Sequence, residues 1–100
     1  MNCNSTNCIY LITCNKCEKQ YVGESGRKLK ERINNHRSDI KTNKHTSIAI
    51  HFNDIGHNFK HFAILPIELI TDPVRRKAKE KWWIKELQTK YPFGLNYYPL

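Results

Sequence analysis

The sequence predicts a small α/β domain in which a three-stranded antiparallel sheet is flanked by helices. Residues 9–13 and 20–23 are two short runs of branched and aromatic residues joined by a turn, a pattern typical of a hairpin. Residues 27–41 then carry apolar positions at helical spacing. The most apolar stretch, residues 62–70, supplies the third strand, and a second long helix follows it.

The helix expected at residues 27–41 places Leu29, Ile33 and Ile40 toward the core. Arg32 and His36 lie four residues apart, so they share one face of this helix. Together with the hairpin, the helix brings an arginine, a histidine and two tyrosines toward one surface.

The third strand and the last helix carry their own boundary signals. Pro66 cannot donate a hydrogen bond within a sheet, so it indicates an edge strand or a bulge. Asp72 is a suitable cap and Pro73 a suitable first residue for a helix that continues to about Thr89. Four positions of this helix are expected to pack in the core: Val74, Ala78, Trp82 or Trp83, and Leu87. The polar residues 1–7 are expected to be loose, and residues 97–100 to form a short tail.

The composition favours a polyanionic partner. Seventeen Lys and Arg against nine Asp and Glu give a net charge of +8 on 100 residues, enough for one domain with a modest core. No long apolar run or basic amphipathic anchor is present, so nucleic acid is favoured over membrane. No apolar segment near residue 1 is typical of a signal peptide, and an intracellular, reducing compartment is therefore expected.

Four cysteines lie within the first 17 residues. Two disulfides in a secreted protein would leave the rest of the chain without a cross-link. Cys14 and Cys17, with a two-residue spacer, instead resemble half of a zinc site. Cys3 is expected to be an exposed thiol and Cys8 a small buried residue at the start of the first strand.

The remaining zinc ligands must come from histidines, because no cysteine follows residue 17. His51 and His57 are the preferred pair: a short helix beginning after Thr46 or Ser47 would end near His51, and Gly56 permits the turn back to His57. His45 and His61 are the alternatives. Such a site would be closed, tetrahedral and structural.

The set of tyrosines, arginine and histidine suits phosphodiester cleavage. That reaction needs a base for the nucleophile, a cation for the charge developing on phosphorus, and usually a metal ion at the leaving oxygen. A phenol has a pKa near ~10, so it becomes a base only where cations favour its ionised form. Arg32 can supply that field and can donate two hydrogen bonds to a phosphate.

These residues carry a resemblance to a known family. Cys8-Ile9-Tyr10 and Tyr21-Val22-Gly23 resemble the two signature tripeptides of the GIY-YIG nucleases, and the arginine-bearing helix follows where that family has it. Glu80 resembles the family's metal-binding glutamate, and Asn96 its C-terminal asparagine. The sequence departs from the pattern at Cys8, which replaces the first glycine, and at Val22, which replaces isoleucine.

The resemblance implies roles for six residues. Tyr10 would be the general base, assisted by Tyr21; Arg32 would stabilise the phosphorane, and His36 would lie near the active site. Glu80 would hold a single divalent ion, Mg²⁺ or Mn²⁺, at the leaving 3′ oxygen. Asn96 would support this arrangement by orienting Glu80, a water or a phosphate. Without the resemblance, Glu80 would be expected to form an ion pair with Arg76, four residues away.

A closer resemblance is to the endonuclease domains of Penelope-like retroelements, which carry a Cys-x2-Cys between the tripeptides and a downstream pair of histidines. It implies that residues 1–100 are one endonuclease domain of a longer retroelement protein, nuclear and tethered to a reverse transcriptase and its RNA, which nicks target DNA. Four basic residues of the first helix are expected to be phosphate contacts or solvated positions rather than catalysts: Arg27, Lys28, Lys30 and Arg37. Lys44, in the loop after this helix, is expected on the DNA-facing surface. Two alternatives remain, a non-cleaving zinc-containing nucleic-acid-binding module and a disulfide-stabilised secreted domain.

Overall fold

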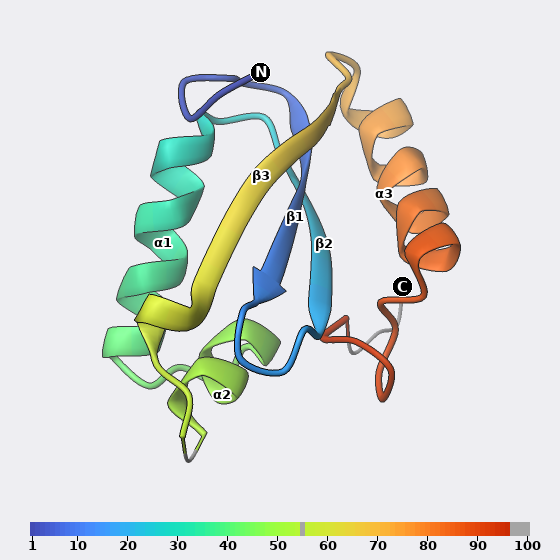
Figure 1. The fold of residues 1–100 in the computed structure, drawn as a ribbon. Coiled ribbons are helices and arrows are strands. Elements are labelled where there is room, and N and C mark those ends of the chain that lie inside the picture. Colours follow the sequence, from blue (N-terminus) through green and yellow to red (C-terminus); the bar gives the residue numbers. More distant parts are fainter. Residues whose placement is uncertain (55, 97–100) are drawn as a thin grey trace.

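A three-stranded antiparallel sheet with strand order β2-β1-β3 forms the centre of the molecule, as the sequence predicts. The computed structural model describes residues 1–54 and 56–96. Strand β1 (Cys8–Cys14) pairs with β2 (Gln20–Ser25) on one side and with β3 (Phe62–Leu69) on the other. Figure 1 shows the sheet lying between helix α1 (Leu29–Lys41) and helix α3 (Pro73–Leu87).

The two faces of β1 pack against different helices, because successive side chains in a strand point to opposite sides. Cys8, Tyr10 and Ile12 are buried beneath α1 and the short helix α2 (Ser47–Asn53). Ile9 is buried on the opposite face with Val22 and Ile84, the latter from α3. The apolar side chains of β1 therefore alternate between two separate cores.

The predicted boundaries of the strands and helices are close to the observed ones. Helix α2 is capped by Thr46, whose side chain accepts a hydrogen bond from the Ala49 amide. Helix α3 begins with Asp72 as cap and Pro73 in its first turn, as predicted. Pro66 lies on the edge strand β3 beside a register shift against β1, so both readings of that proline are confirmed.

The expectation that residues 1–7 are loose is wrong. The Leu29 and Lys30 amides lie at the start of α1, where amides have no acceptor within the helix. They donate hydrogen bonds to the Ser5 and Cys3 carbonyls, respectively. The N-terminal segment thus caps this helix. The short tail expected at residues 97–100 lies outside the described residues.

The predicted inward face of α3 is also wrong in part. Val74 is 77% exposed, and Ala78 and Leu87 are exposed as well. Ile84 and Arg76 are the buried residues of this helix, while Trp83 packs at the margin of the core. The helix contacts the sheet along a narrow line, so fewer positions are covered than the apolar pattern indicates.

No helix in the described part of the chain, residues 1–54 and 56–96, is long and apolar enough to span a membrane.

Candidate active site and metal centre

Tyr10, Arg32 and His36 form one hydrogen-bonded cluster. The Tyr10 hydroxyl lies 3.0 Å from His36 Nε2 and accepts a hydrogen bond of 3.1 Å from Arg32 Nη2. Arg32 Nη2 lies 3.4 Å from His36 Nε2. Because β1 presents Tyr10 to the α1 layer and residues 32 and 36 share one face of α1, the fold itself assembles the cluster.

Gly23 makes room for the Tyr10 ring. The two residues are cross-strand partners in the β1–β2 pair. A Cβ atom at Gly23 would overlap the Tyr10 ring and hydroxyl. The glycine that ends the second tripeptide therefore lets the Tyr10 phenol approach β2 closely.

The protonation of the cluster follows from its burial. Burial, followed by the Arg32 charge, lowers the pKa of His36 to about 4, so its imidazole is neutral at pH 7. Arginine can only donate, and it faces Nε2, so Nε2 is the unprotonated nitrogen. The Tyr10 hydroxyl then donates its proton to Nε2 while it accepts from Arg32.

Tyr10 is held as a phenol. Its side chain has no exposed surface, and burial, more than the neighbouring Tyr21, raises its pKa well above the ordinary value. The Arg32 charge and hydrogen bond act in the opposite direction but do not cancel the effect of burial. Tyr21 lies on the same face, with its ring 6.2 Å from that of His36, and burial raises its pKa too.

Glu80 is a half-buried carboxylate on α3 beside Glu24 of β2. Burial, and then the Glu24 charge, raise the pKa of Glu80 to about 7. The charge of Glu80 also acts on both phenols, where it raises the pKa of Tyr10 and of Tyr21. The phenols and the carboxylate therefore lie within electrostatic reach of each other, although they come from different layers.

The ion pair expected between Glu80 and Arg76 does not form. Arg76 Nε instead donates to Glu24 at 2.7 Å, and Arg76 Nη1 donates to Asn7 Oδ1 and to two carbonyls of the β3–α3 loop. A buried guanidinium needs several acceptors, which Glu80 alone could not supply. Glu24 is thereby neutralised, and Glu80 has no cationic partner at salt-bridge distance among residues 1–54 and 56–96.

This environment fits a divalent cation. A half-buried carboxylate with no ion-pair partner, next to a second carboxylate, is stabilised in its charged form when a cation binds. Glu80 is the residue that would hold such an ion.

Asn96 binds the edge of the sheet. Its side chain accepts a hydrogen bond of 2.9 Å from the Val22 amide and donates one of 2.9 Å to the Val22 carbonyl. Its Oδ1 also accepts from the Thr89 hydroxyl at 2.7 Å. These bonds attach the C-terminal segment to β2 at Val22, the residue between Tyr21 and Gly23. Thr89 was not foreseen as its partner, because nothing in the local sequence pairs the two.

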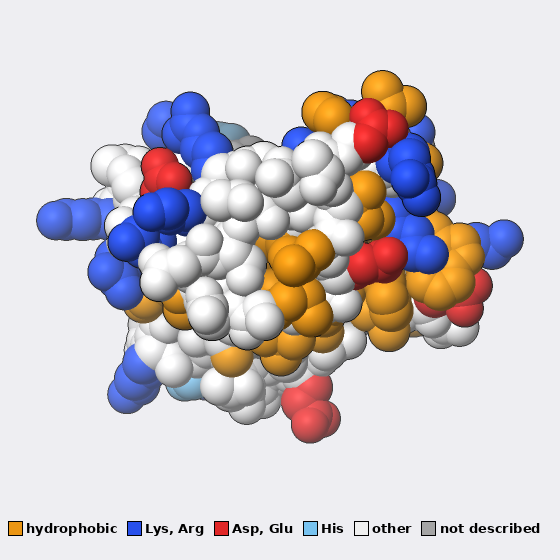
Figure 2. Space-filling view, turned by 90° about the horizontal axis from the view of Figure 1, so that it is seen from above, with side chains coloured by type: hydrophobic (Ala, Val, Ile, Leu, Met, Phe, Trp, Pro, Cys, Tyr) orange, Lys and Arg blue, Asp and Glu red, His pale blue; other side chains and the backbone are white. Residues whose placement is uncertain are grey.

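The residues predicted to contact phosphates are all exposed: Arg27, Lys28, Lys30, Arg37 and Lys44. The Arg37 guanidinium also lies over the Phe59 ring, 4.7 Å from its centroid. Figure 2 views the molecule from above, relative to Figure 1, and shows Lys and Arg side chains gathered on two flanks with hydrophobic side chains between them.

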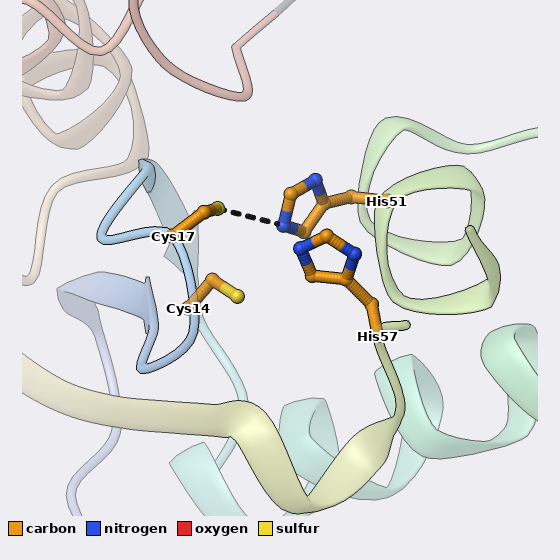
Figure 3. A group of neighbouring side chains, drawn as sticks. All are labelled: Cys14, Cys17, His51 and His57. Atoms are coloured by element: carbon orange, nitrogen blue, oxygen red, sulfur yellow. Dashed lines mark hydrogen bonds between the residues drawn. The ribbon is translucent and has the colours of Figure 1, made fainter. Parts of the chain in front are cut away.

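The four predicted zinc ligands come together at the tip of the hairpin. Their ligand atoms all lie within 4.8 Å of one another (Figure 3). Cys14 and Cys17 come from the β1–β2 hairpin, His51 from α2, and His57 from the segment after it. Ligands about 2.0–2.3 Å from one tetrahedral zinc ion lie roughly 3.3–3.8 Å from each other, so the cluster must contract by about 1 Å to hold the ion.

Both ring nitrogens of His57 are buried and have no hydrogen-bond partner within residues 1–54 and 56–96. Burial lowers the pKa of His51, which keeps that imidazole neutral and able to act as a ligand. Cys17 Sγ lies 3.4 Å from His51 Nε2. An orphaned buried imidazole beside two thiols fits a Cys2His2 zinc site.

The two histidines considered as alternative zinc ligands, His45 and His61, lie outside the cluster. His45 is exposed in the loop before α2 and is not part of the cluster. His61 Nδ1 accepts a hydrogen bond from the Asn58 amide, and its ring centroid lies 6.2 Å from that of His57. All four cysteines are free, so the disulfide-stabilised alternative is wrong.

The sequence model of the GIY-YIG catalytic domain matches residues 6–93. The chain therefore belongs to the GIY-YIG catalytic domain family. A search of curated proteins found no significant match.

Two solved structures are similar over nearly the whole chain. The catalytic domain of the homing endonuclease I-TevI is 28% identical, with a TM-score of 0.75 over 90% of this chain and 96% of that one. A glutamate-to-alanine mutant of the catalytic domain of intron endonuclease I-TevI gives a TM-score of 0.77 at 24% identity, covering 92% and 93% of the two chains. The second comparison supports the fold alone.

Proposed function

We propose that this domain is a divalent-metal-dependent DNA endonuclease that hydrolyses phosphodiester bonds. The observation that carries the proposal is the cluster of Tyr10, Arg32 and His36, joined by contacts of 3.0–3.4 Å, with the Glu80 charge acting on Tyr10. The family and the similarity to the catalytic domain of a homing endonuclease support the same reaction.

The proton path runs through Tyr10 to His36. As water attacks phosphorus, its proton passes to the Tyr10 oxygen, and the Tyr10 proton passes to His36 Nε2, which is neutral and 3.0 Å away. This relay avoids a free phenolate, which the buried position of Tyr10 disfavours. Because Tyr10 has no exposed surface in the free protein, DNA binding must open a path to its hydroxyl.

The other residues stabilise the developing charges. Arg32 donates hydrogen bonds to the non-bridging oxygens of the pentavalent phosphorus centre as their negative charge grows. Glu80 would hold a divalent ion, Mg²⁺ or Mn²⁺, which would supply Lewis-acid stabilisation of the leaving 3′ oxygen. The bond from phosphorus to the 3′ oxygen breaks, which leaves a 5′ phosphate and a 3′ alkoxide, and the alkoxide takes a proton from solvent water to become the 3′ hydroxyl. Tyr21 contributes to the field around Tyr10, and Asn96 keeps both tyrosines in register through Val22.

Nicking of supercoiled plasmid with Mg²⁺ tests the proposal. Tyr10→Phe, Arg32→Ala and Glu80→Ala should each slow nicking by about 100-fold or more, since each removes a group that acts in the transition state. Lys41→Ala, an exposed cation at the far end of α1, is the control. Undiminished nicking by the Glu80 variant would rule out its assigned role.

The Cys14, Cys17, His51 and His57 cluster is proposed to bind a structural zinc ion. All four protein ligands close the coordination sphere, which is typical of a structural rather than a catalytic site. Elemental analysis of purified protein should give one zinc per chain. A protein without zinc that retains its folded state would contradict the proposal.

The biological setting rests on the closer resemblance to Penelope-like endonuclease domains. In that setting the domain belongs to a nuclear retroelement protein, is tethered to a reverse transcriptase and its RNA, and nicks target DNA to prime synthesis. The test is whether a nick made by the full protein becomes the 3′ end from which complementary DNA is extended.

A second function is favoured by one observation, the complete burial of Tyr10 with a raised pKa. If the Tyr10 hydroxyl stays buried when DNA binds, the domain would be a zinc-containing nucleic-acid-binding module that does not cleave DNA. It would bind DNA with a steep salt dependence and leave the plasmid intact at any Mg²⁺ concentration.

A further inference from the structure

A polar pocket of about 420 Å³ opens beside the Tyr10 cluster. It is lined by residues 24–27, which run from the end of β2 into the loop before α1, by Arg32 and Asn35 of α1, and by Arg76 of α3. Arg32 belongs to both places, because its Nη2 contacts Tyr10 and its side chain also forms a wall of the pocket. The pocket is therefore adjacent to the reacting centre.

The charge of the pocket favours an anion. Three arginines and one glutamate line it, which gives a net charge of +2 (three positive minus one negative). Glu24 is already paired with Arg76 at 2.7 Å. Arg27 and Arg32 form no ion pair among residues 1–54 and 56–96, so their charges are available to a ligand.

The available hydrogen-bond donors are side chains. The Arg32 Nε is buried without a partner in the described part of the chain. The first amides of α1 are not available, since the Leu29 and Lys30 amides donate to the N-terminal segment. The Arg27 amide donates to the Ser25 hydroxyl at 3.0 Å, which fixes the loop that carries the Arg27 side chain.

We propose that this pocket binds the DNA phosphate next to the one that is cleaved, with Arg27 and Asn35 as its side-chain ligands. The inference rests on the proposed endonuclease function and assigns a second subsite to it. Arg32 and Asn35 are three residues apart on α1, so their side chains are neighbours at about 5–6 Å. Consecutive phosphates of one strand can then be bound by consecutive positions of one helix face. Arg27 can donate two hydrogen bonds to the second phosphate, and the Asn35 amide one.

Binding and cleavage measured separately test the subsite. Affinity for a fluorescein-labelled duplex is followed by anisotropy without Mg²⁺ at several salt concentrations. Arg27→Ala should weaken binding about tenfold, as expected for a hydrogen bond to a charged group, and Asn35→Ala about fivefold. Arg27→Ala should also reduce the slope of log K against log salt by about 1, as one phosphate contact is lost. The matched controls Lys41→Ala and Asn34→Ala, both exposed on α1 and outside the pocket, should bind like wild type.

The cleavage data separate this subsite from the reacting phosphate. At saturating DNA with Mg²⁺, Arg27→Ala and Asn35→Ala should lose far less of the nicking rate than Arg32→Ala, because they contribute to binding rather than to the transition state. Unchanged affinity and salt slope for Arg27→Ala would overturn the proposal. So would unchanged affinity with a large loss of rate, which would place Arg27 at the reacting phosphate. Wild-type protein that binds but never nicks would contradict the endonuclease function, while the binding data would still decide the pocket.

Discussion

At the scale of single residues, the site depends on a phenol that is enclosed by its neighbours. Tyr10 is buried on the α1 side of the sheet, with Arg32 and His36 at its hydroxyl and Gly23 beneath its ring. The two tripeptides of the sequence meet here as cross-strand partners, Tyr10 opposite Gly23. Motif residues that are separate in the sequence thus form a single packing unit.

Substitution of Gly23 tests this unit. Gly23→Ala places a methyl group inside the Tyr10 ring, so it should displace the phenol, destabilise the fold by about 1–3 kcal/mol and abolish nicking. In Gly26→Ala the added methyl group meets the end of the Arg76 side chain at 3.2 Å and Asn7 Oδ1 at 3.6 Å, so this variant should be milder. Urea denaturation and plasmid nicking measure both effects. Equal behaviour of the two variants would show that the close approach at Gly23 is unimportant.

The buried His36 gives the stability a defined pH dependence. The pKa of His36 is about 4 in the folded protein, against an ordinary value of 6.5. Between these values the unfolded chain binds a proton that the folded chain does not, so the free energy of unfolding falls as the pH drops from about 6.5 to about 4. His36→Gln removes this contribution, and its stability should fall less between pH 7 and pH 5 than that of wild type. Parallel pH profiles from urea denaturation would contradict the burial of a neutral imidazole.

The proposed zinc ligands could be predicted from the sequence, whereas the partner of Arg76 could not. Ligand chemistry and a two-residue spacer were sufficient to propose Cys14 and Cys17 as metal ligands, and the structure brings His51 and His57 to them. The partner of Arg76 could not be foreseen. A helical spacing of four residues suggests Glu80, yet the buried guanidinium is bound by acceptors from Asn7, Glu24 and the β3–α3 loop. Only the tertiary fold brings these acceptors together.

At the scale of elements, the strands and helices were predictable because each carries its own local signal. The turn at Cys14–Cys17, the cap at Thr46 and the Asp72-Pro73 pair each define a boundary without tertiary information. The inward face of α3 was not predictable in the same way. Its apolar residues outnumber the positions that the sheet covers, and Val74 remains exposed.

The C-terminal segment is an element that completes the sheet edge. The Leu95 amide donates to the Gln20 carbonyl, and the Asn96 side chain bonds both backbone groups of Val22. β2 is thereby covered on its outer side, opposite β1. The position of Tyr21 and Gly23 depends on this covering.

Substitution of Asn96 by alanine tests whether the position of β2 depends on the Asn96 side chain. Asn96→Ala leaves the Val22 amide and carbonyl without partners, at a cost of about 1–3 kcal/mol for each buried group. Thr89→Val removes only the bond to Asn96 Oδ1 and should cost less. Thermal unfolding of the two variants gives the comparison. A stability for Asn96→Ala equal to that of wild type would mean that the edge does not need this side chain.

At the scale of the whole molecule, the proposed zinc site links the tip of the β1–β2 hairpin to α2 and to the segment that follows it. The hairpin tip carries two thiols, while α2 and the following segment carry two imidazoles. A domain of 100 residues has a modest core, so a bound ion contributes a large share of its stability.

Substitution of single histidines decides which of them are ligands. His57→Ala should lose zinc, and even a loss of about 2 kcal/mol would lower the Tm by roughly 8–16 °C for a domain of this size. His61 lies beside the Cys14, Cys17, His51 and His57 cluster without belonging to it. The His61→Ala variant should therefore retain zinc and a nearly unchanged Tm. Elemental analysis and thermal unfolding provide the two readouts. Full zinc content in His57→Ala would exclude it as a ligand.

The central claim is that Tyr10 and Glu80, which reach the site from opposite layers of the molecule, act on one phosphate in one transition state. Single-turnover nicking by wild type, Tyr10→Phe, Glu80→Gln and the double variant measures this directly. Groups that act as a unit have non-additive effects, so the double variant should be about as slow as the slower single variant. A wild-type rate in either single variant, or a double variant slowed by the product of the two separate effects, would contradict the claim.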